Sequence, residues 1–304
     1  MHKLLKRFSA PTLVMMIGVT ITSHVSQAQL ISDSVLIEGN YRSFHFNKSA
    51  SPSAGRSLFF IMHGSGGNGR QMINGAAKIE AMSERENLLI VYPDGYKKYW
   101  NECRLVATSA ANQENVNEAA FFDSMIHYFS RRYEVNERHV FATGMSGGGH
   151  MAYKLALTMP GKISAIAAIV ANLPDSANMD CVASGIPVPV MIINGTDDPV
   201  NPFNGGEVKV TGARLGTVRS TEATFKYWAQ LAGYKGKPKT TLLPDVDPTD
   251  GKTIVRSSYR KRGKPSVELL TVNNGKHDYP KDIDVYLEAW NFFKKELRIP
   301  TPVK

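Results

Sequence analysis

HVFATGMSGGGHMAYKLAL, residues 139–157, holds a G-x-S-x-G motif between a segment typical of a strand and one typical of a helix. A sharp turn of this kind lifts the Ser146 hydroxyl clear of the sheet. Gly144 and Gly148 leave the strand and the helix room to approach each other. The N–H of Gly147 lies at the helix start, where backbone donors and the helix dipole stabilise the negative charge of an oxyanion. The motif predicts a nucleophile at Ser146 and an oxyanion donor at Gly147, although a Gly-rich turn can contain it by chance.

A second Gly-rich segment, HGSGGN at residues 63–68, follows a continuous apolar run at 58–62. Such loops can cradle a phosphate, but this one lacks the Gly-Lys-Ser/Thr ending of a P-loop. The alternative is a loop that supplies the second oxyanion donor, for which we favour the backbone N–H of Ser65. His63 is interpreted as a structural residue that braces the loop.

Ser146, Asp198 and His277 each come just after a predicted strand. Catalytic groups of open α/β sheets collect at the carboxyl ends of the strands, and the chain order Ser, Asp, His occurs in α/β-hydrolases. In this hypothesis His277 takes the Ser146 proton, and Asp198 orients the imidazole. Asp197 is the competing acid. Asp198 is preferred because Pro199 restrains the backbone directly after it.

Predicted strands and helices alternate along the chain, which indicates a mostly parallel central sheet with helices on both faces. The expected strands are 58–62, 88–92, 139–142, 163–170, 188–193 and 267–272, with hairpins at 35–46 and 240–259. The expected helices are 74–86, 115–133, 221–231 and 282–297, besides the one after Ser146. At 304 residues the chain fits one large domain.

Residues 1–28 are expected to be a cleaved signal peptide, because basic residues precede an apolar run too short to span a bilayer. Ser26-Gln27-Ala28 then offers small residues for cleavage. The catalytic domain would be residues 29–304, exported to the periplasm or the exterior, with no stable membrane anchor. The formal net charge is +9, but the basic residues are scattered apart from a cluster at 260–264. We infer no nucleic-acid partner, and leave weak attraction to anionic polymer or cell-surface material open.

Cys103 and Cys181 are the only cysteines. Export predicts a disulfide between them, and two unpaired thiols are the alternative. With no nearby His cluster they give no zinc signature, and we expect neither a metal nor a cofactor.

The motifs together resemble those of the secreted esterase/poly(3-hydroxybutyrate) depolymerase-like α/β-hydrolases, which include feruloyl and acetylxylan esterases. The resemblance covers nearly all of residues 29–304. Its motifs are HGSGGN (63–68), YPDG (92–95) with Trp100 and Cys103, GMSGGGHMAYKLA (144–156), GTDDPV (195–200) with the following NGG, and NGKH (274–277). It implies an α/β-hydrolase fold, the acid at Asp198, the base at His277 and the Cys103–Cys181 pairing.

The chain departs from the family after the base, where it has Asp278-Tyr279-Pro280 instead of the common Thr-Trp-Pro, and at residues 116–118, where acidic pairs are usual. No appended polymer-binding domain is expected. We therefore predict an exported serine esterase that cleaves carboxylic esters through an acyl-enzyme, with a small ester, oligomer or polysaccharide-linked acyl group as substrate. Trp100 and Tyr279 are weaker candidates for its substrate wall. A serine peptidase of this fold and a non-catalytic binding protein are the alternatives.

Overall fold

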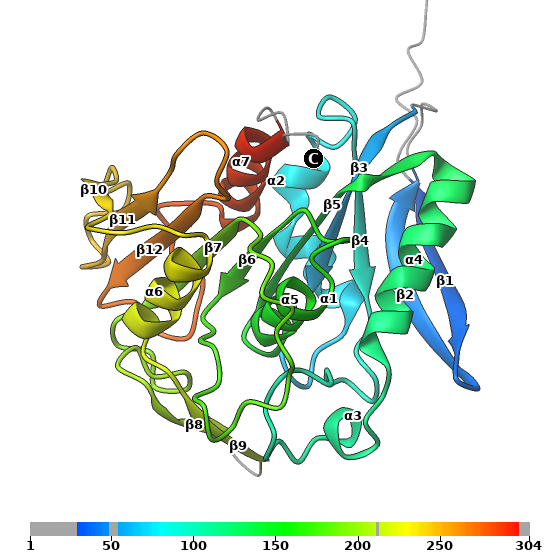
Figure 1. Cartoon of the computed structure of the whole chain (residues 1–304). Helices are drawn as coiled ribbons and strands as arrows, with labels where there is room; N and C mark the ends of the chain where they lie inside the picture. The colour runs from blue at the N-terminus through cyan, green and yellow to red at the C-terminus, as the bar shows by residue number, and fades with distance from the viewer. Residues whose placement is uncertain (1–28, 49–53, 211–212, 298–304) are drawn as a thin grey trace, which may run out of the picture.

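A computed structural model describes residues 29–48, 54–210 and 213–297, so the expected signal peptide at 1–28 lies outside the described residues. Within them, ten strands form one sheet in the order β1–β2–β4–β3–β5–β6–β7–β12–β11–β10, and β8 and β9 form a separate ladder (Figure 1). The strands are β1 Gln29–Ile37, β2 Asn40–Lys48, β3 Arg56–Met62, β4 Leu88–Pro93, β5 Val135–Met145, β6 Ala165–Ile169, β7 Val190–Gly195, β8 Gly206–Val210, β9 Ala213–Val218, β10 Lys239–Leu242, β11 Thr253–Tyr259 and β12 Val267–Asn273.

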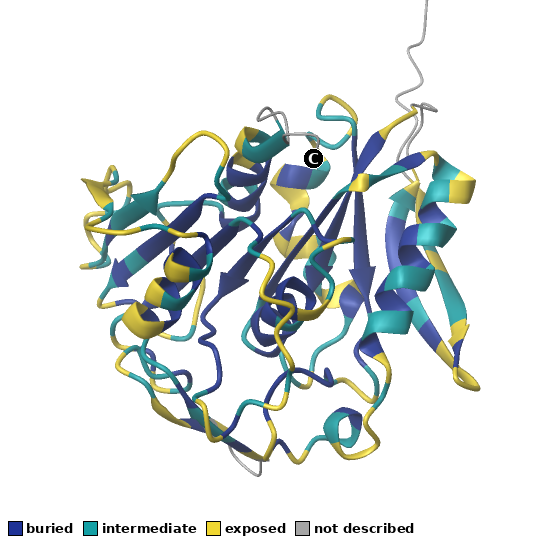
Figure 2. Cartoon of the chain, viewed as in Figure 1, coloured by how far each residue is buried: buried dark blue, intermediate teal, exposed yellow. Residues whose placement is uncertain are grey.

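The centre of the sheet is parallel and its edges are antiparallel. Strands β4, β3, β5, β6, β7 and β12 run in one direction. Antiparallel β2 and β1 extend one edge, and antiparallel β11 and β10 extend the other. Central strands such as β3 are buried along their whole length, which explains their continuous apolar sequences (Figure 2). The prediction of a mostly parallel sheet is confirmed.

Helices cover both faces of the sheet, as predicted. They are α1 Gly69–Gly75, α2 Ala77–Glu80, α3 Ala110–Gln113, α4 Glu118–Tyr133, α5 Gly147–Thr158, α6 Thr221–Leu231 and α7 Val285–Leu297. Alternate side chains of β3 enter two different cores, because successive residues of a strand point to opposite faces. Phe60 packs in the core that contains residues of α4, α5 and α6, whereas Phe59 packs in the core with α2 and α7.

Two expectations for local structure are wrong. A helix was expected at 74–86, but α1 starts at Gly69, because Asn68 and Gln71 form a capping box in which each side chain bonds the other's backbone N–H. No strands were expected at 206–218, where β8 and β9 lie. Buried residues of this ladder pack on Ala107 from a distant loop, and that tertiary contact has no signature in the local sequence.

Three strands that end next to predicted catalytic residues are close neighbours in the sheet. β5 precedes Ser146, β7 precedes Asp198 and β12 precedes His277, and their order is β5–β6–β7–β12. Since all four strands are parallel, their carboxyl ends lie along the same edge. The topology therefore brings the three loops together.

Candidate active site

Ser146 lies on the strained turn that its motif predicts. Its backbone has φ 54° and ψ −115°, a conformation that L-residues with side chains seldom adopt. The Ser146 N–H donates to the Ile169 carbonyl at 2.8 Å, which ties the turn to the end of β6. A Cβ on Gly144 would lie 2.4 Å from the Gly148 carbonyl carbon, and one on Gly148 would lie 2.5 Å from the Met62 oxygen. Both positions thus require glycine for the turn to form.

His277 and Asp198 form a directly bonded pair. His277 Nδ1 lies 2.7 Å from Asp198 Oδ2, and the Asp198 side chain is 1% exposed against 18% for that of His277. The other oxygen, Asp198 Oδ1, accepts the N–H groups of Val200 and Asn201, both at 2.8 Å. The carboxylate is held by three donors and aimed at the imidazole, an arrangement that fixes the tautomer with Nε2 free to accept a proton.

Asp197, the competing acid, has a different place. It is exposed, and its backbone N–H donates to the Gly275 carbonyl at 2.9 Å. A Cβ on Gly195 would lie 2.2 Å from that same carbonyl oxygen. The segments before Asp198 and His277 therefore touch through their backbones, and Asp197 contributes to that contact instead of facing the imidazole.

Ser146 and His277 follow strands that end at the same sheet edge, and among the described residues no hydrogen bond joins Ser146 Oγ to His277. His150 lies one helical turn after Ser146, and its backbone N–H donates to the Ser146 carbonyl at 2.9 Å. Burial lowers the pKa of His150 well below its usual value, and the nearby charges of Arg104 and His277 act in the same direction. Catalytic hydrogen bonds of unliganded enzymes often tighten only when substrate binds.

The two predicted oxyanion donors lie side by side. A Cβ on Gly147 would meet Ser65 Oγ at 2.6 Å and Ser65 N at 3.0 Å. Among the described residues neither backbone N–H has a hydrogen-bond acceptor, whereas the next two N–H groups of the loop bond the carbonyls of Lys98 and Gly64. Two unpaired donors next to the elbow can stabilise a developing oxyanion.

His63 braces this loop from below, in line with its structural interpretation. It is 1% exposed; its Nε2 accepts the Gly95 N–H at 2.9 Å and its Nδ1 bonds the Gly64 carbonyl at 2.7 Å. The ring is neutral in this role, because its Nε2 accepts an N–H, and burial lowers the pKa of His63 in the same sense. Trp100 is 2% exposed, packs on His63 and donates its indole N–H to the His63 carbonyl at 2.9 Å. Trp100 thus supports the loop and offers almost no surface to a substrate.

Tyr279 is a partly exposed residue two positions after His277. Tyr279 is 36% exposed. Its hydroxyl lies 2.9 Å from the hydroxyl of the buried Tyr286 on α7. The Tyr279 ring is held at its hydroxyl end and is otherwise open to solvent. Tyr279 therefore fits the wall of a substrate site better than the buried Trp100 does.

Asp94 is not among the predicted site residues, but its carboxylate holds the end of the 63–68 loop in place. Its carboxylate accepts hydrogen bonds from Ser43 Oγ, His45 Nε2 and the N–H of Gly69. Burial would raise the pKa of Asp94, but these donors outweigh burial and lower it to about 2. One carboxylate joins β2, the end of β4 and the first residue of α1. This role explains the acidic residue of the YPDG motif, the signal that could have identified it.

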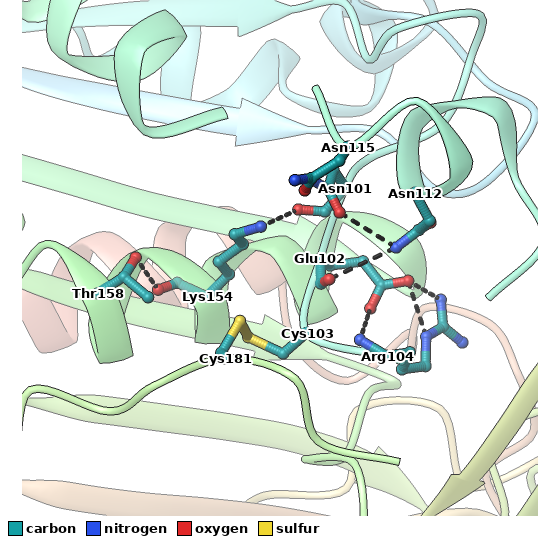
Figure 3. The surroundings of a disulfide bond; sticks show 9 residues. All are labelled: Asn101, Glu102, Cys103, Arg104, Asn112, Asn115, Lys154, Thr158 and Cys181. Atoms are coloured by element: carbon teal, nitrogen blue, oxygen red, sulfur yellow. Dashed lines mark hydrogen bonds and ion pairs between the residues drawn. A yellow bond between two sulfur atoms is a disulfide. The ribbon is translucent and has the colours of Figure 1, made fainter. Parts of the chain in front are cut away.

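Cys103 and Cys181 are disulfide-bonded, as predicted, and close a span of 78 residues (Figure 3). The same loop is held to α5 by Lys154, whose Nζ donates to the Asn101 carbonyl at 2.6 Å. Beside the disulfide, Arg104 and Glu102 form a buried ion pair of 2.7 Å. The loop after β4 is therefore fixed against the helix that carries Ser146.

The described residues contain no group of three or more His, Cys, Asp or Glu side chains placed to hold a metal ion. In the same part of the chain, no helix has both the length and the apolar character needed to cross a membrane.

The strand order, the elbow and the Asp–His pair define an α/β-hydrolase fold. Two solved structures share it: acetyl xylan esterase from Aspergillus awamori (TM-score 0.57, 16% identity, 88% of this chain and 99% of that one) and S-formylglutathione hydrolase from Staphylococcus aureus (TM-score 0.52, 11% identity, 90% and 99%). The predicted fold is confirmed.

Relatives are similar in sequence as well. Putative esterase NocK of Nocardia uniformis subsp. tsuyamanensis is 24% identical over 84% of this chain and 76% of its own length. Probable feruloyl esterase C of Aspergillus clavatus is 28% identical over 78% and 76%, and feruloyl esterase C of Emericella nidulans is 29% identical over 51% and 53%. No family model matches. The chain is similar in sequence to proteins named as esterases and feruloyl esterases and shares the fold of an acetyl xylan esterase, which agrees with the resemblance of its motifs.

Proposed function

We propose that this protein is a serine esterase that hydrolyses carboxylic esters through an acyl-enzyme. The observation that carries the proposal is the partly buried Asp198–His277 hydrogen bond of 2.7 Å at the same sheet edge as the strained turn of Ser146. Relatives called feruloyl esterase C and putative esterase support the reaction class.

In the proposed mechanism, Ser146 Oγ attacks the ester carbonyl while His277 Nε2 accepts its proton. The N–H groups of Gly147 and Ser65 stabilise the resulting oxyanion. His277 returns the proton to the departing alcohol and an acyl-enzyme remains. Water, activated by the same imidazole, then attacks this acyl group and releases the acid. Asp198 orients the imidazole and stabilises its cation in both halves of the reaction.

The substrate proposal is an ester of feruloyl, acetyl or hydroxybutyrate type, either small or attached to an oligomer or polysaccharide. We further propose that residues 1–28 direct export and that residues 29–304 are one catalytic domain in the periplasm or outside the cell. The disulfide supports export, because disulfides persist in oxidising compartments.

A hydrolysis panel tests the function. Purified protein should cleave p-nitrophenyl acetate and butyrate and at least one of methyl ferulate, acetylated xylan oligomers or hydroxybutyrate oligomers. It should leave the matching anilides intact. A serine peptidase of this fold would instead prefer amide bonds, and a non-catalytic protein would neither turn over an ester nor react with a fluorophosphonate probe.

A further inference from the structure

A groove of about 840 Å³ lies between α6 and the β11–β12 edge of the sheet, apart from the catalytic residues. Figure 1 shows α6 beside this extended end of the sheet. One stripe of α6 forms a wall, because Glu222, Lys226 and Gln230 recur at four-residue spacing. The groove has the size of a typical ligand site.

The floor of the groove is apolar and one end is close to the catalytic loops. Phe203, Phe225 and Leu269 supply much of this floor. Phe203 lies two residues after Asn201, whose N–H holds Asp198, and the Phe203 carbonyl accepts the N–H of Thr221 at the start of α6. A chain lying in the groove would therefore lead toward the acid side of the proposed active site.

The other end of the groove is basic. Lys235 and Lys237 line it, and Lys226 stands on the helix wall, against a single acidic lining residue, Glu222. Within the part of the chain that the structure describes, none of these three lysines has an ion-pair partner, in contrast to Lys281, which pairs with Asp247. The charge of this mouth is uncompensated.

The basic run of residues 260–264 joins the same mouth. Lys264 Nζ donates to the Gly233 carbonyl and lies 5.3 Å from the centre of the Tyr234 ring. Tyr234 in turn stacks on Tyr259, with ring centres 5.2 Å apart. These contacts fix the loop after β11 against the loop after α6, so Lys264 adds a positive charge beside Lys235, whereas Arg260 of the same run is paired with Glu268 and Glu296.

We propose that this groove binds an acidic oligosaccharide, a stretch of uronate-type sugars, and presents esters on that chain to the active site. The carboxylates would face the lysines, while the apolar faces of the sugar rings would lie on the floor. A concave groove as long as α6, roughly 16 Å, admits a single chain and not a flat bilayer. Nucleic acid carries no carboxylic ester to be cleaved. The assignment of this oligosaccharide as a substrate rests on the proposed esterase function.

Binding is tested with unesterified polygalacturonate, dextran as the neutral polymer, single-stranded DNA, and vesicles of phosphatidylcholine with phosphatidylglycerol. The groove variant is K235Q/K237Q; the control is K48Q/R131Q, which removes the same charge from exposed residues near the opposite sheet edge. We expect the wild type to bind polygalacturonate and not dextran. The groove variant should bind roughly tenfold more weakly, since each exposed ionic contact contributes roughly threefold, and the control should match the wild type.

Hydrolysis separates this proposal from the proposed function. The groove variant should cleave p-nitrophenyl acetate like the wild type and show a raised KM only on acetylated polygalacturonate. Equal binding by the groove and control variants, or tighter binding of DNA or vesicles through the same lysines, would overturn the groove assignment. Groove-dependent polygalacturonate binding by a wild-type protein that cleaves no ester would support the groove and refute the esterase.

Discussion

Asp198 Oδ2 and His277 Nδ1 lie 2.7 Å apart although 79 residues separate them in the chain. The contact exists because β7 and β12 pair in parallel, with Gly195 opposite Val272, so that the two loops leave the sheet at the same point. Among the described residues, the second ring nitrogen of His277, Nε2, has no hydrogen-bond partner.

Replacing Ser146 with alanine should lower kcat for p-nitrophenyl esters roughly 10⁶-fold, because no other hydroxyl occupies the elbow. Fluorophosphonate labelling should disappear. Circular dichroism and the melting temperature should show an intact fold, since alanine removes only the hydroxyl oxygen of Ser146. Residual turnover near the wild-type rate in S146A would assign the nucleophile elsewhere.

The two neighbouring acids should behave differently. Asp198→Asn should reduce kcat by about 10⁴-fold, because an amide in place of the carboxylate favours the wrong imidazole tautomer. Asp197→Asn, the matched control, should stay within a few-fold of the wild type, because Asp197 is exposed and contributes through its backbone N–H. Steady-state kinetics at several pH values checks both, and the reverse ranking would make Asp197 the acid.

The oxyanion loop should respond to backbone crowding more than to loss of a side chain. Gly147→Ala places a methyl group 3.0 Å from Ser65 N, so it should displace a donor and lower kcat about 10²-fold or more. Ser65→Ala keeps the backbone N–H and should change kcat only a few-fold. If Ser65→Ala were as damaging as Gly147→Ala, the hydroxyl and not the N–H would be the donor.

Reduction of the Cys103–Cys181 bond should lower the free energy of unfolding by about 4 kcal/mol, since the bond closes a long loop in the unfolded chain. Denaturant unfolding of the wild type with and without reductant measures this loss. The C103S/C181S variant should match the reduced wild type and be insensitive to reductant. An equal free energy in both redox states would show that the bond does not constrain the unfolded chain.

Asp94 should make stability depend on acid pH. Its folded-state pKa of about 2 lies below the ordinary 3.8, so the carboxylate stabilises the fold above pH 4, and this contribution is lost as the pH falls toward 2. Asp94→Asn should therefore destabilise the protein at neutral pH and flatten the decline of unfolding free energy between pH 5 and 2. Unfolding titrations of both proteins across that range supply the comparison, and parallel curves would contradict it.

Some helices and strands could be predicted because their local patterns agree with their tertiary surroundings. The helix expected at 221–231 matches α6 at both ends, since Ser220 caps it and its apolar stripe faces the core. The start of α1 precedes the expected helix start at residue 74, although the Asn68–Gln71 capping box is a local signal in the sequence. The β8–β9 ladder is different, because it is stabilised by contacts with a distant loop.

The amino-acid sequence alone determined the class of fold, the elbow at Ser146 and the candidate acid and base, because glycine spacing and buried strands are local properties of the chain. Only the tertiary structure decided that Asp198 and not Asp197 faces His277, that Trp100 is buried beneath the oxyanion loop, and that Lys264 meets the loop of Lys235. These outcomes depend on which strand ends and loops become neighbours. Strand pairing sets that arrangement across long separations that no local pattern records.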